Sequence, residues 1–135
     1  MGKGLVTVIG AGLAGCEAAH YLARHGFSVG LYDSKPNKFT PAHSSKNLAE
    51  LVCSNSLKSG DVWGNACGLL KEEMRLLGSL VMEAADATKE PGGGALAVDR
   101  EAFSAYITEK IRSNPSIVYI PEKEKELPQG YAIVA

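Results

Sequence analysis

The sequence predicts an α/β fold of the Rossmann type, with a parallel sheet whose strands are joined by helical crossovers. Three observations carry this prediction. An apolar run with β-branched residues, Leu5 to Ile9, leads directly into a glycine-rich motif, and a helical pattern follows it. Further apolar runs then alternate with helical patterns, as they do in β-α-β units. The chain has 135 residues, 45% of them hydrophobic, which suits one globular domain.

The glycine-rich motif predicts a dinucleotide-binding turn between the first strand and the first helix. In this kind of turn Gly10 permits a sharp bend, Gly12 lets a pyrophosphate approach the backbone, and Gly15 lets the helix pack close to the strands. The start of the helix offers free N–H groups and the positive end of its dipole to the phosphates. The predicted cofactor-binding residues of the turn are Gly10, Ala11, Gly12, Leu13, Ala14 and Gly15.

The first helix is predicted from Leu13 to about His25, with Gly26 as its stop. Four apolar residues at helical spacing predict its buried face: Ala14, Ala18, Tyr21 and Leu22. Three polar residues are expected to point toward solvent on another face: Glu17, His20 and Arg24.

A second strand is predicted from Phe27 to Tyr32, and Asp33 stands at its end. A carboxylate at this position accepts hydrogen bonds from ribose hydroxyls and repels a 2′-phosphate. Asp33 is therefore predicted to bind the cofactor ribose, which disfavours NADP at this turn and leaves both NAD and FAD open. An ordinary acidic residue at a strand end is the alternative.

Periodicity is absent from Ser34 to Gly60, and residues 33–64 are predicted to form a functional loop inserted in the domain. Residues 34–60 contain four lysines and only one acidic residue, Glu50. Such a bias fits either a solvated surface or contacts with phosphates.

The second half is predicted to add helices and strands. Asn65 suits an N-cap for a helix that Gly78-Ser79 interrupts, and Asp99 suits the N-cap of another helix. The apolar stripe of the helix after Asn65 consists of Ala66, Leu70, Met74 and Leu77, with Lys71 pointing elsewhere. Extended segments are expected at 95–98, 117–120 and 131–135.

The three cysteines, Cys16, Cys53 and Cys67, include no C-x-x-C pair. This argues against a disulfide scaffold and a zinc site, and we expect no metal. No apolar run reaches transmembrane length, and the net charge of −1 does not indicate a nucleic-acid binder. We expect a cytoplasmic protein with no membrane contact.

Several stretches together resemble the N-terminal part of TrmFO, the folate- and FAD-dependent tRNA (uracil-5-)-methyltransferase family of bacteria. The first stretch is shared with many flavoproteins, whereas the middle ones are more specific. The resembling stretches are 8–19, 39–43, 49–57, 69–74 and 93–101. Asp33 stands where this family usually has Glu, which keeps the acceptor, and Cys67 replaces an aliphatic residue, so we expect Cys67 in the core.

The resemblance implies FAD bound at the glycine turn, methylenetetrahydrofolate as one-carbon donor, NAD(P)H as reductant and a T-loop uridine of tRNA as substrate. Uracil C5 is a poor nucleophile, and addition of a thiolate at C6 activates it. The resemblance makes Cys53 the candidate catalytic thiol. The residues alone also allow an inert thiol in a small buried run, Leu51-Val52-Cys53. Cys16 is interpreted as structural.

Two alternatives remain at this point. One is a related flavoenzyme of the MnmG type that modifies another tRNA uridine. The other is a non-enzymatic FAD-binding remnant, because the last strand stops at Ala135 where members of this flavoprotein class continue into Thr-Gly. We expect residues 1–135 to be the N-terminal part of an FAD-binding domain, truncated before completion and inactive alone. The sequence predicts no particular oligomeric state.

Overall fold

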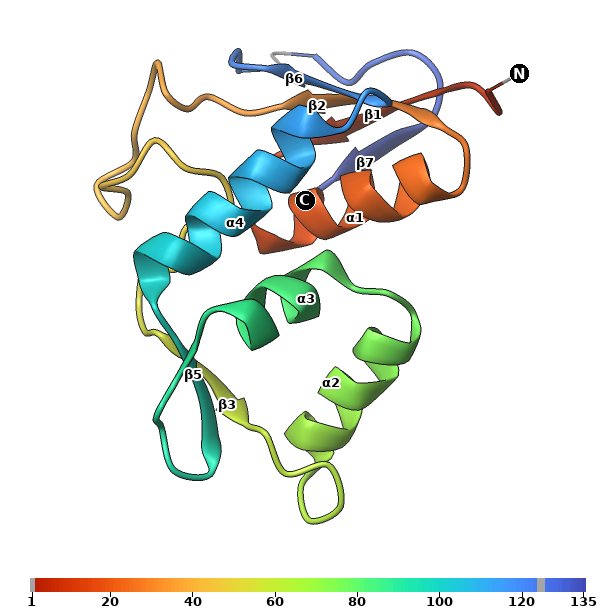
Figure 1. Cartoon of the computed structure of the whole chain (residues 1–135). Coiled ribbons are helices and arrows are strands. Elements are labelled where there is room, and N and C mark those ends of the chain that lie inside the picture. The colour runs from red at the N-terminus through yellow and green to blue at the C-terminus, as the bar shows by residue number, and fades with distance from the viewer. Residues whose placement is uncertain (1, 124–125) are drawn as a thin grey trace.

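The structure is a computed structural model that describes residues 2–123 and 126–135. Its helices and strands follow the predicted alternation (Figure 1). In chain order they are β1 (Leu5–Ile9), α1 (Leu13–Arg24), β2 (Ser28–Tyr32), β3 (Ser56–Ser59), α2 (Ala66–Leu76), α3 (Leu80–Ala87), β4 (Lys89–Glu90), β5 (Ala95–Val98), α4 (Arg100–Ser113), β6 (Ile117–Ile120) and β7 (Ala132–Val134).

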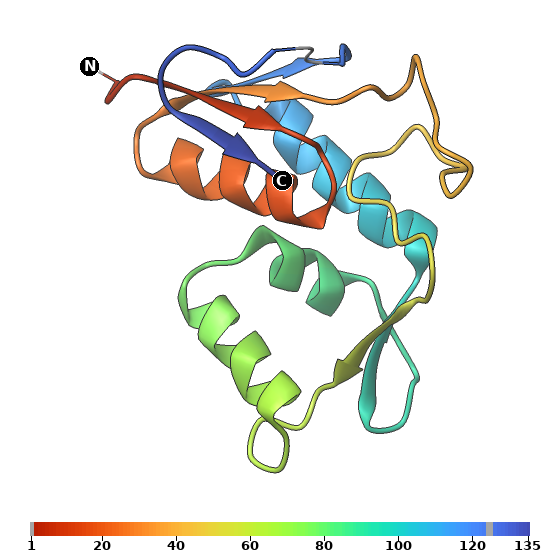
Figure 2. The ribbon, with the colours of Figure 1, turned by 180° about the vertical axis from the view of Figure 1, so that it is seen from behind.

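Four strands form the parallel sheet, in the order β6-β2-β1-β7. The Rossmann-like α/β prediction is therefore confirmed. The chain passes from β1 to β2 on one side, and β7 pairs with β1 on the other. The carboxyl end of β1 is thus the point where strand order reverses, which is where ligands bind in open α/β sheets. From behind, β7 is seen to end beside the first turn of α1 (Figure 2).

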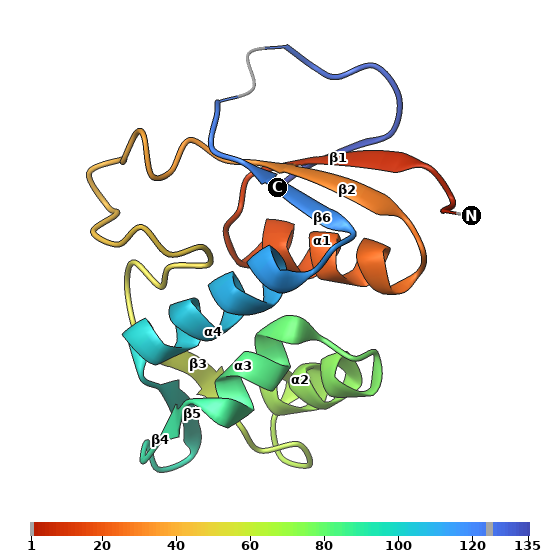
Figure 3. The ribbon, with the colours of Figure 1, turned by 45° about the horizontal axis from the view of Figure 1, so that its top comes forward.

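Helices α1 and α4 cover one face of this sheet, with α3 beneath them (Figure 3). Val8, Val29 and Leu31 point into that layer and are fully buried or nearly so, as are Phe103 and Ile107 of α4. Alternation along the strands places these side chains on one face. The core therefore lies between the sheet and the helices and holds the start of α1 against the end of β1.

A second, antiparallel sheet has the order β3-β5-β4, and the sequence did not predict it. Ser56–Ser59 falls within the segment predicted to be loop, and that prediction is wrong. The strand is polar and half-exposed, so it lacks the apolar alternation that marks a strand in sequence. The strand forms because its backbone pairs with β5. The Val98 N–H extends this pairing by donating to the Asn55 carbonyl at 3.0 Å.

The predicted buried face of α1 is wrong. Gly15, Cys16 and Ala19 are the residues packed inside, whereas Ala14 is exposed and Tyr21 is 47% exposed. Small residues bring the helix close to the sheet, so they occupy the inner face. Glu17, expected in solvent, instead accepts hydrogen bonds from Ser79 Oγ and from the first two N–H groups of α3 at 2.5–3.0 Å.

Helix α2 begins at the predicted N-cap, since Asn65 accepts a hydrogen bond from the Cys67 N–H at 2.9 Å. Its predicted apolar stripe is wrong: Leu70 and Leu77 are exposed, and Lys71 is buried, donating to the Ser59 and Cys67 carbonyls. Cys67 is exposed, which corrects its expected place in the core.

Candidate functional site

The three glycines of the turn have the conformations that their predicted roles need. Gly10 has φ +101°, a region that favours glycine. A Cβ on Gly15 would lie 1.7 Å from the Gly10 carbonyl oxygen, so only glycine allows α1 to begin this close to β1. A Cβ on Gly12 would meet no atom within 4 Å. The backbone at Gly12 therefore faces open space at the N-cap of α1, where an anionic ligand could approach.

The Ala11 peptide in the middle of the turn is held on both sides. Its N–H donates to Asp33 Oδ2 at 2.7 Å, and its carbonyl accepts from the Ala49 N–H at 2.9 Å. The Cys16 thiol also donates to this carbonyl, at 3.4 Å. Ala49 adopts φ +51°, which is uncommon outside glycine. The turn is thus fixed by the end of β2 and by the loop that precedes Cys53.

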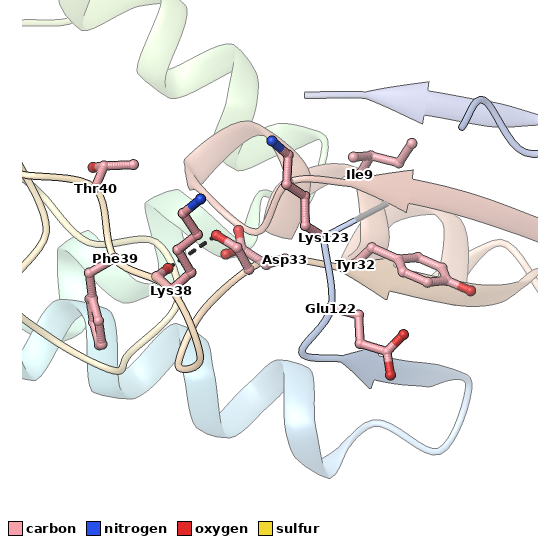
Figure 4. A pocket seen from close by; sticks show the side chains of 10 residues that line it. Ile9, Tyr32, Asp33, Lys38, Phe39, Thr40, Glu122 and Lys123 are labelled. Carbon is pink, nitrogen blue, oxygen red and sulfur yellow. Dashed lines mark hydrogen bonds between the residues drawn. The ribbon is translucent and has the colours of Figure 1, made fainter. Parts of the chain in front are cut away.

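Asp33 lies at the end of β2, as predicted, and has a second bond there: its Oδ1 accepts from the Lys35 N–H at 2.9 Å. Each carboxylate oxygen has two lone pairs, so both oxygens keep acceptor capacity for a hydroxyl. Asp33 also lines a cavity of about 440 Å³ at the carboxyl ends of β1 and β2. Figure 4 shows Asp33 between Ile9 and Tyr32 on one side and Phe39 and Thr40 on the other.

The loop after Asp33 is built around a buried ion pair that the sequence did not reveal. Lys35 is 4% exposed, and its Nζ donates to Glu50 Oε2 at 2.9 Å and to the Ser45 and Asn47 carbonyls at 3.2 and 2.7 Å. Glu50 Oε1 accepts from Ser44 N–H, Ser44 Oγ and Ser45 N–H at 2.9–3.0 Å. Lys35 therefore belongs to neither a solvated surface nor a phosphate site. The other loop lysines, Lys38, Lys46 and Lys58, are exposed.

The Glu50 carboxylate makes this loop sensitive to acid. Burial raises the pKa of Glu50, but the hydrogen bonds from Ser44 and Lys35 outweigh it and lower the pKa from 4.5 to about 2. The resulting stabilisation is complete above pH 4.5 and is lost as the pH falls toward 2. We expect Glu50 to account for a loss of about 2 kcal/mol in the free energy of unfolding between about pH 6 and about pH 3.

Denaturant unfolding of the wild type and of Glu50→Gln at both pH values measures this effect. The wild type should lose about 2 kcal/mol more than the variant, which has no carboxylate to protonate. Equal losses in the two proteins would show that Glu50 titrates normally.

Cys53 is exposed, on a short arch anchored at both ends. The Leu51 carbonyl before it accepts from Arg100 Nε at 3.0 Å and also from Arg100 Nη2. The Asn55 carbonyl after it is bound by Val98, next to the N-cap of α4. The alternative of an inert thiol in a buried run is wrong for Cys53, because only Leu51 of that run is buried. The sequence does not predict that Arg100 anchors this segment, because the Leu51 carbonyl that it binds is 49 residues away.

The turn and Asp33 are in direct contact, through the hydrogen bond between Ala11 and Asp33. Cys53 makes no such bond, but Ala49, four residues before it, is hydrogen-bonded to the turn. Cys16 is fully buried. Its burial and the charges of Asp33 and Glu17 raise the pKa of this thiol to about 12, which supports its structural interpretation.

No group of three His, Cys, Asp or Glu in residues 2–123 and 126–135 is arranged to hold a metal ion. No helix in the described part of the chain has the length and apolar content needed to cross a bilayer.

A parallel sheet, a glycine turn at its switch point and an acidic residue after β2 define the class of Rossmann-like nucleotide-binding proteins. The family model for glucose inhibited division protein A matches residues 5–134, and the chain belongs to this family. It is also similar in fold to the solved structure of Aquifex aeolicus GidA, with a TM-score of 0.67 at 21% identity, over 87% of this chain and 19% of that one.

Curated relatives share more of the sequence. The chain is 56% identical over 131 residues to a protein of Lactobacillus delbrueckii and 56% identical over 133 residues to one of Geobacter sulfurreducens. It is 52% identical over 135 residues to a protein of Staphylococcus carnosus. Each relative is named methylenetetrahydrofolate–tRNA-(uracil-5-)-methyltransferase TrmFO. These matches cover 96%, 98% and 100% of this chain, but the chain spans only 30% or 31% of the relatives' length.

Proposed function

We propose that this chain is the cofactor-binding part of an FAD-dependent tRNA (uracil-5-)-methyltransferase. The observation that carries the proposal is the identity of 52–57% to relatives with that name, over nearly the whole chain. The geometry supports it, because a dinucleotide needs an open backbone at Gly12 and an acceptor at Asp33, and both are present at one end of the sheet.

The residues that would hold FAD are Gly10–Gly15 and Asp33. The Gly12 N-cap and the start of α1 would lie against the pyrophosphate, and Asp33 would accept from a ribose hydroxyl. Bound there, FAD would supply the electron-transfer chemistry for moving a one-carbon unit from methylenetetrahydrofolate, with NAD(P)H as reductant. The hydrogen bonds to Ala11 hold the turn in its binding conformation before any ligand arrives, which lowers the ordering cost of binding.

Cys53 is proposed as the nucleophile toward the tRNA uridine. Its thiolate would add to uracil C6, and the displaced electron pair would make C5 the nucleophile for the one-carbon unit. After transfer, loss of the C5 proton would expel the one-carbon carrier and leave an exocyclic methylene at C5. A hydride equivalent from NAD(P)H would then reduce this methylene to methyl as the thiolate leaves C6, which restores the uracil ring. Cys53 is exposed between Leu51 and Asn55, as a thiol that is to meet a tRNA base must be. A cytoplasmic location accompanies this proposal, since tRNA is the substrate.

The proposal is tested in a chimera in which this chain replaces the matching segment of the Staphylococcus carnosus relative. The chimera should methylate T-loop uridine with methylenetetrahydrofolate and NAD(P)H. Cys53→Ser should lower the rate by at least about a hundredfold, because a hydroxyl is a far weaker nucleophile than a thiolate. Cys67→Ser removes the other exposed thiol and serves as the matched control.

Full activity of the Cys53→Ser chimera would exclude the nucleophile assignment. A chimera that leaves the T-loop unmodified but changes another tRNA uridine, detected by mass spectrometry, would favour an MnmG-type activity. That second candidate stands because the family model that matches is the GidA one. A soluble chimera without any tRNA activity would favour a non-enzymatic module.

A further inference from the structure

The arch that carries Cys53 is fixed at its two ends but not at the cysteine itself. Within the described chain, the backbone of Val52 and of Cys53 forms no hydrogen bond. The nearest bonds to other elements are those at the Leu51 carbonyl on one side and the Asn55 carbonyl on the other. The place of the Cys53 thiol therefore depends on these two anchors.

Both anchors come from the segment that joins β5 to α4, but they differ in kind. The Val98 N–H donates to the Asn55 carbonyl and extends the pairing of β3 with β5, which involves backbone atoms only. The Leu51 carbonyl is instead bound by a side chain, since Arg100 Nε donates to it at 3.0 Å and Arg100 Nη2 donates as well. Only the anchor at Leu51 thus depends on a side chain.

The form of this side chain suits an anchor. Nε and Nη2 lie on one edge of the planar guanidinium, and a rigid fork on one oxygen fixes direction as well as distance. Arg100 is the first residue of α4, and helical side chains tilt toward the N-terminus of their helix. The tilt takes the guanidinium back past the helix start, where it meets the Leu51 carbonyl.

The position of Arg100 runs against the preference of the helix. The N-terminus of a helix is the positive end of its dipole, so a cation in the first turn is unfavourable there. Glu101, the next residue, has the charge that this turn favours. Residues that contradict a local preference are typical of functional sites. The bidentate contact with Leu51 gives Arg100 a specific task at this position.

The residues before the arch are fixed to the cofactor turn. The Ala49 N–H donates to the Ala11 carbonyl at 2.9 Å, and Glu50 belongs to the buried ion pair with Lys35. Together with Leu51, three consecutive residues are held by the turn, by the ion pair and by α4. Cys53 follows only two residues later, so the hold on Leu51 is the last one before the thiol.

We propose that Arg100 is a positioning residue, which holds the Leu51 carbonyl and thereby fixes the Cys53 thiol relative to the cofactor turn. The inference rests on the proposed function, in which the thiol adds to uracil C6 while C5 must meet the one-carbon unit. Two reacting centres then have to lie in register, and a displacement of about 1 Å can lower a rate about a hundredfold.

Steady-state kinetics of the Staphylococcus carnosus chimera tests the catalytic consequence. Arg100→Ala should lower kcat at least about thirtyfold, because the thiol is displaced from the base. The KM for tRNA and the affinity for FAD should stay within about threefold, since Ala49 keeps its own bond to the turn. Arg100→Lys restores one donor to the Leu51 carbonyl and should bring kcat back to within about tenfold of the wild type.

Arg24→Ala is the matched control. Arg24 Nη1 also donates to backbone carbonyls, those of Leu77 and Gly78 at 3.3 and 2.8 Å, but in the turn between α2 and α3. This substitution removes the same kind of bond without touching the arch, so kcat should stay within about twofold of the wild type. A fall in kcat as large as that of Arg100→Ala would overturn the proposal, as would an Arg100→Ala variant that changes KM alone.

Nuclear magnetic resonance relaxation of this chain gives a readout without catalysis. The order parameter of the Cys53 amide should be about 0.85 in the wild type and in Arg24→Ala, and below about 0.6 in Arg100→Ala. Equal order parameters in Arg100→Ala and the wild type would contradict the proposal. An inactive wild-type chimera would contradict the proposed function instead, and the order parameters would still decide whether Arg100 fixes Cys53.

Discussion

Replacing Gly15 by alanine is expected to lower the free energy of unfolding by about 3 kcal/mol or to prevent folding. The new Cβ would lie 1.7 Å from the Gly10 carbonyl oxygen and 2.8 Å from its carbon. Both atoms belong to the backbone at the end of β1, so relief requires moving α1 away from the sheet. That movement would also separate Cys16 and Ala19 from the core. Urea unfolding followed by circular dichroism measures the loss.

Gly12→Ala is the matched control, since it adds the same methyl group three residues earlier. Gly12 has φ −75°, and a Cβ there meets nothing within 4 Å. Its stability should change by no more than about 1 kcal/mol, the range for residue changes at an N-cap. If both variants were equally stable, α1 would not pack against β1 as described.

Replacing Lys35 by methionine is expected to destabilise the chain by about 3 kcal/mol, because one partner of a buried ion pair is removed and the other stays behind. Glu50 would lose its counter-charge, and the Ser45 and Asn47 carbonyls would lose their donor. Since Ala49 in the same segment binds Ala11, the loss should reach the cofactor turn. Thermal and urea unfolding at neutral pH check the prediction.

Lys38→Met is the control, because Lys38 lies on the same loop and is exposed. It should change stability by no more than about 0.5 kcal/mol, as is usual for surface substitutions. Similar effects of the two substitutions would mean that Lys35 contributes only surface charge.

Elements whose structure depends on neighbours along the chain are predictable from the sequence. The sequence predicts the strand before the glycine motif, strand β5 at Ala95–Val98 and strand β6 at Ile117–Ile120 with these bounds. Asn65 and Asp99 cap their helices as predicted, because an N-cap bonds to backbone two or three residues later.

The buried faces of the helices depend on contacts between residues far apart in the chain, and the sequence does not predict them. The apolar stripes of α1 and α2 have the correct helical period, but the period cannot say which face meets the sheet. In α1 the small residues Gly15 and Ala19 took the inner face. In α2, a Cβ on Gly68 would lie 1.9 Å from the Asp61 carbonyl oxygen, so the face with Gly68 and Lys71 packs inward instead.

The candidate site likewise has features that the sequence predicts and features that it does not. The conformations of Gly10, Gly12 and Gly15 follow from a local motif and could be predicted. The hydrogen bonds of Ala11 with Asp33 and Ala49 join residues 22 and 38 positions apart, so no local sequence pattern predicts them. The lysine-rich loop after Asp33 therefore stabilises the glycine turn, through the hydrogen bond from Ala49 to Ala11.

The central claim is that the glycine turn binds a dinucleotide at the open backbone of Gly12. The most direct test is a titration of this chain and of Gly12→Ala with FAD, followed by flavin fluorescence. The account predicts saturable binding to the wild-type chain and at least about tenfold weaker binding to the stably folded Gly12→Ala, because the added methyl occupies the place of the pyrophosphate. Equal affinities in the two proteins would contradict it.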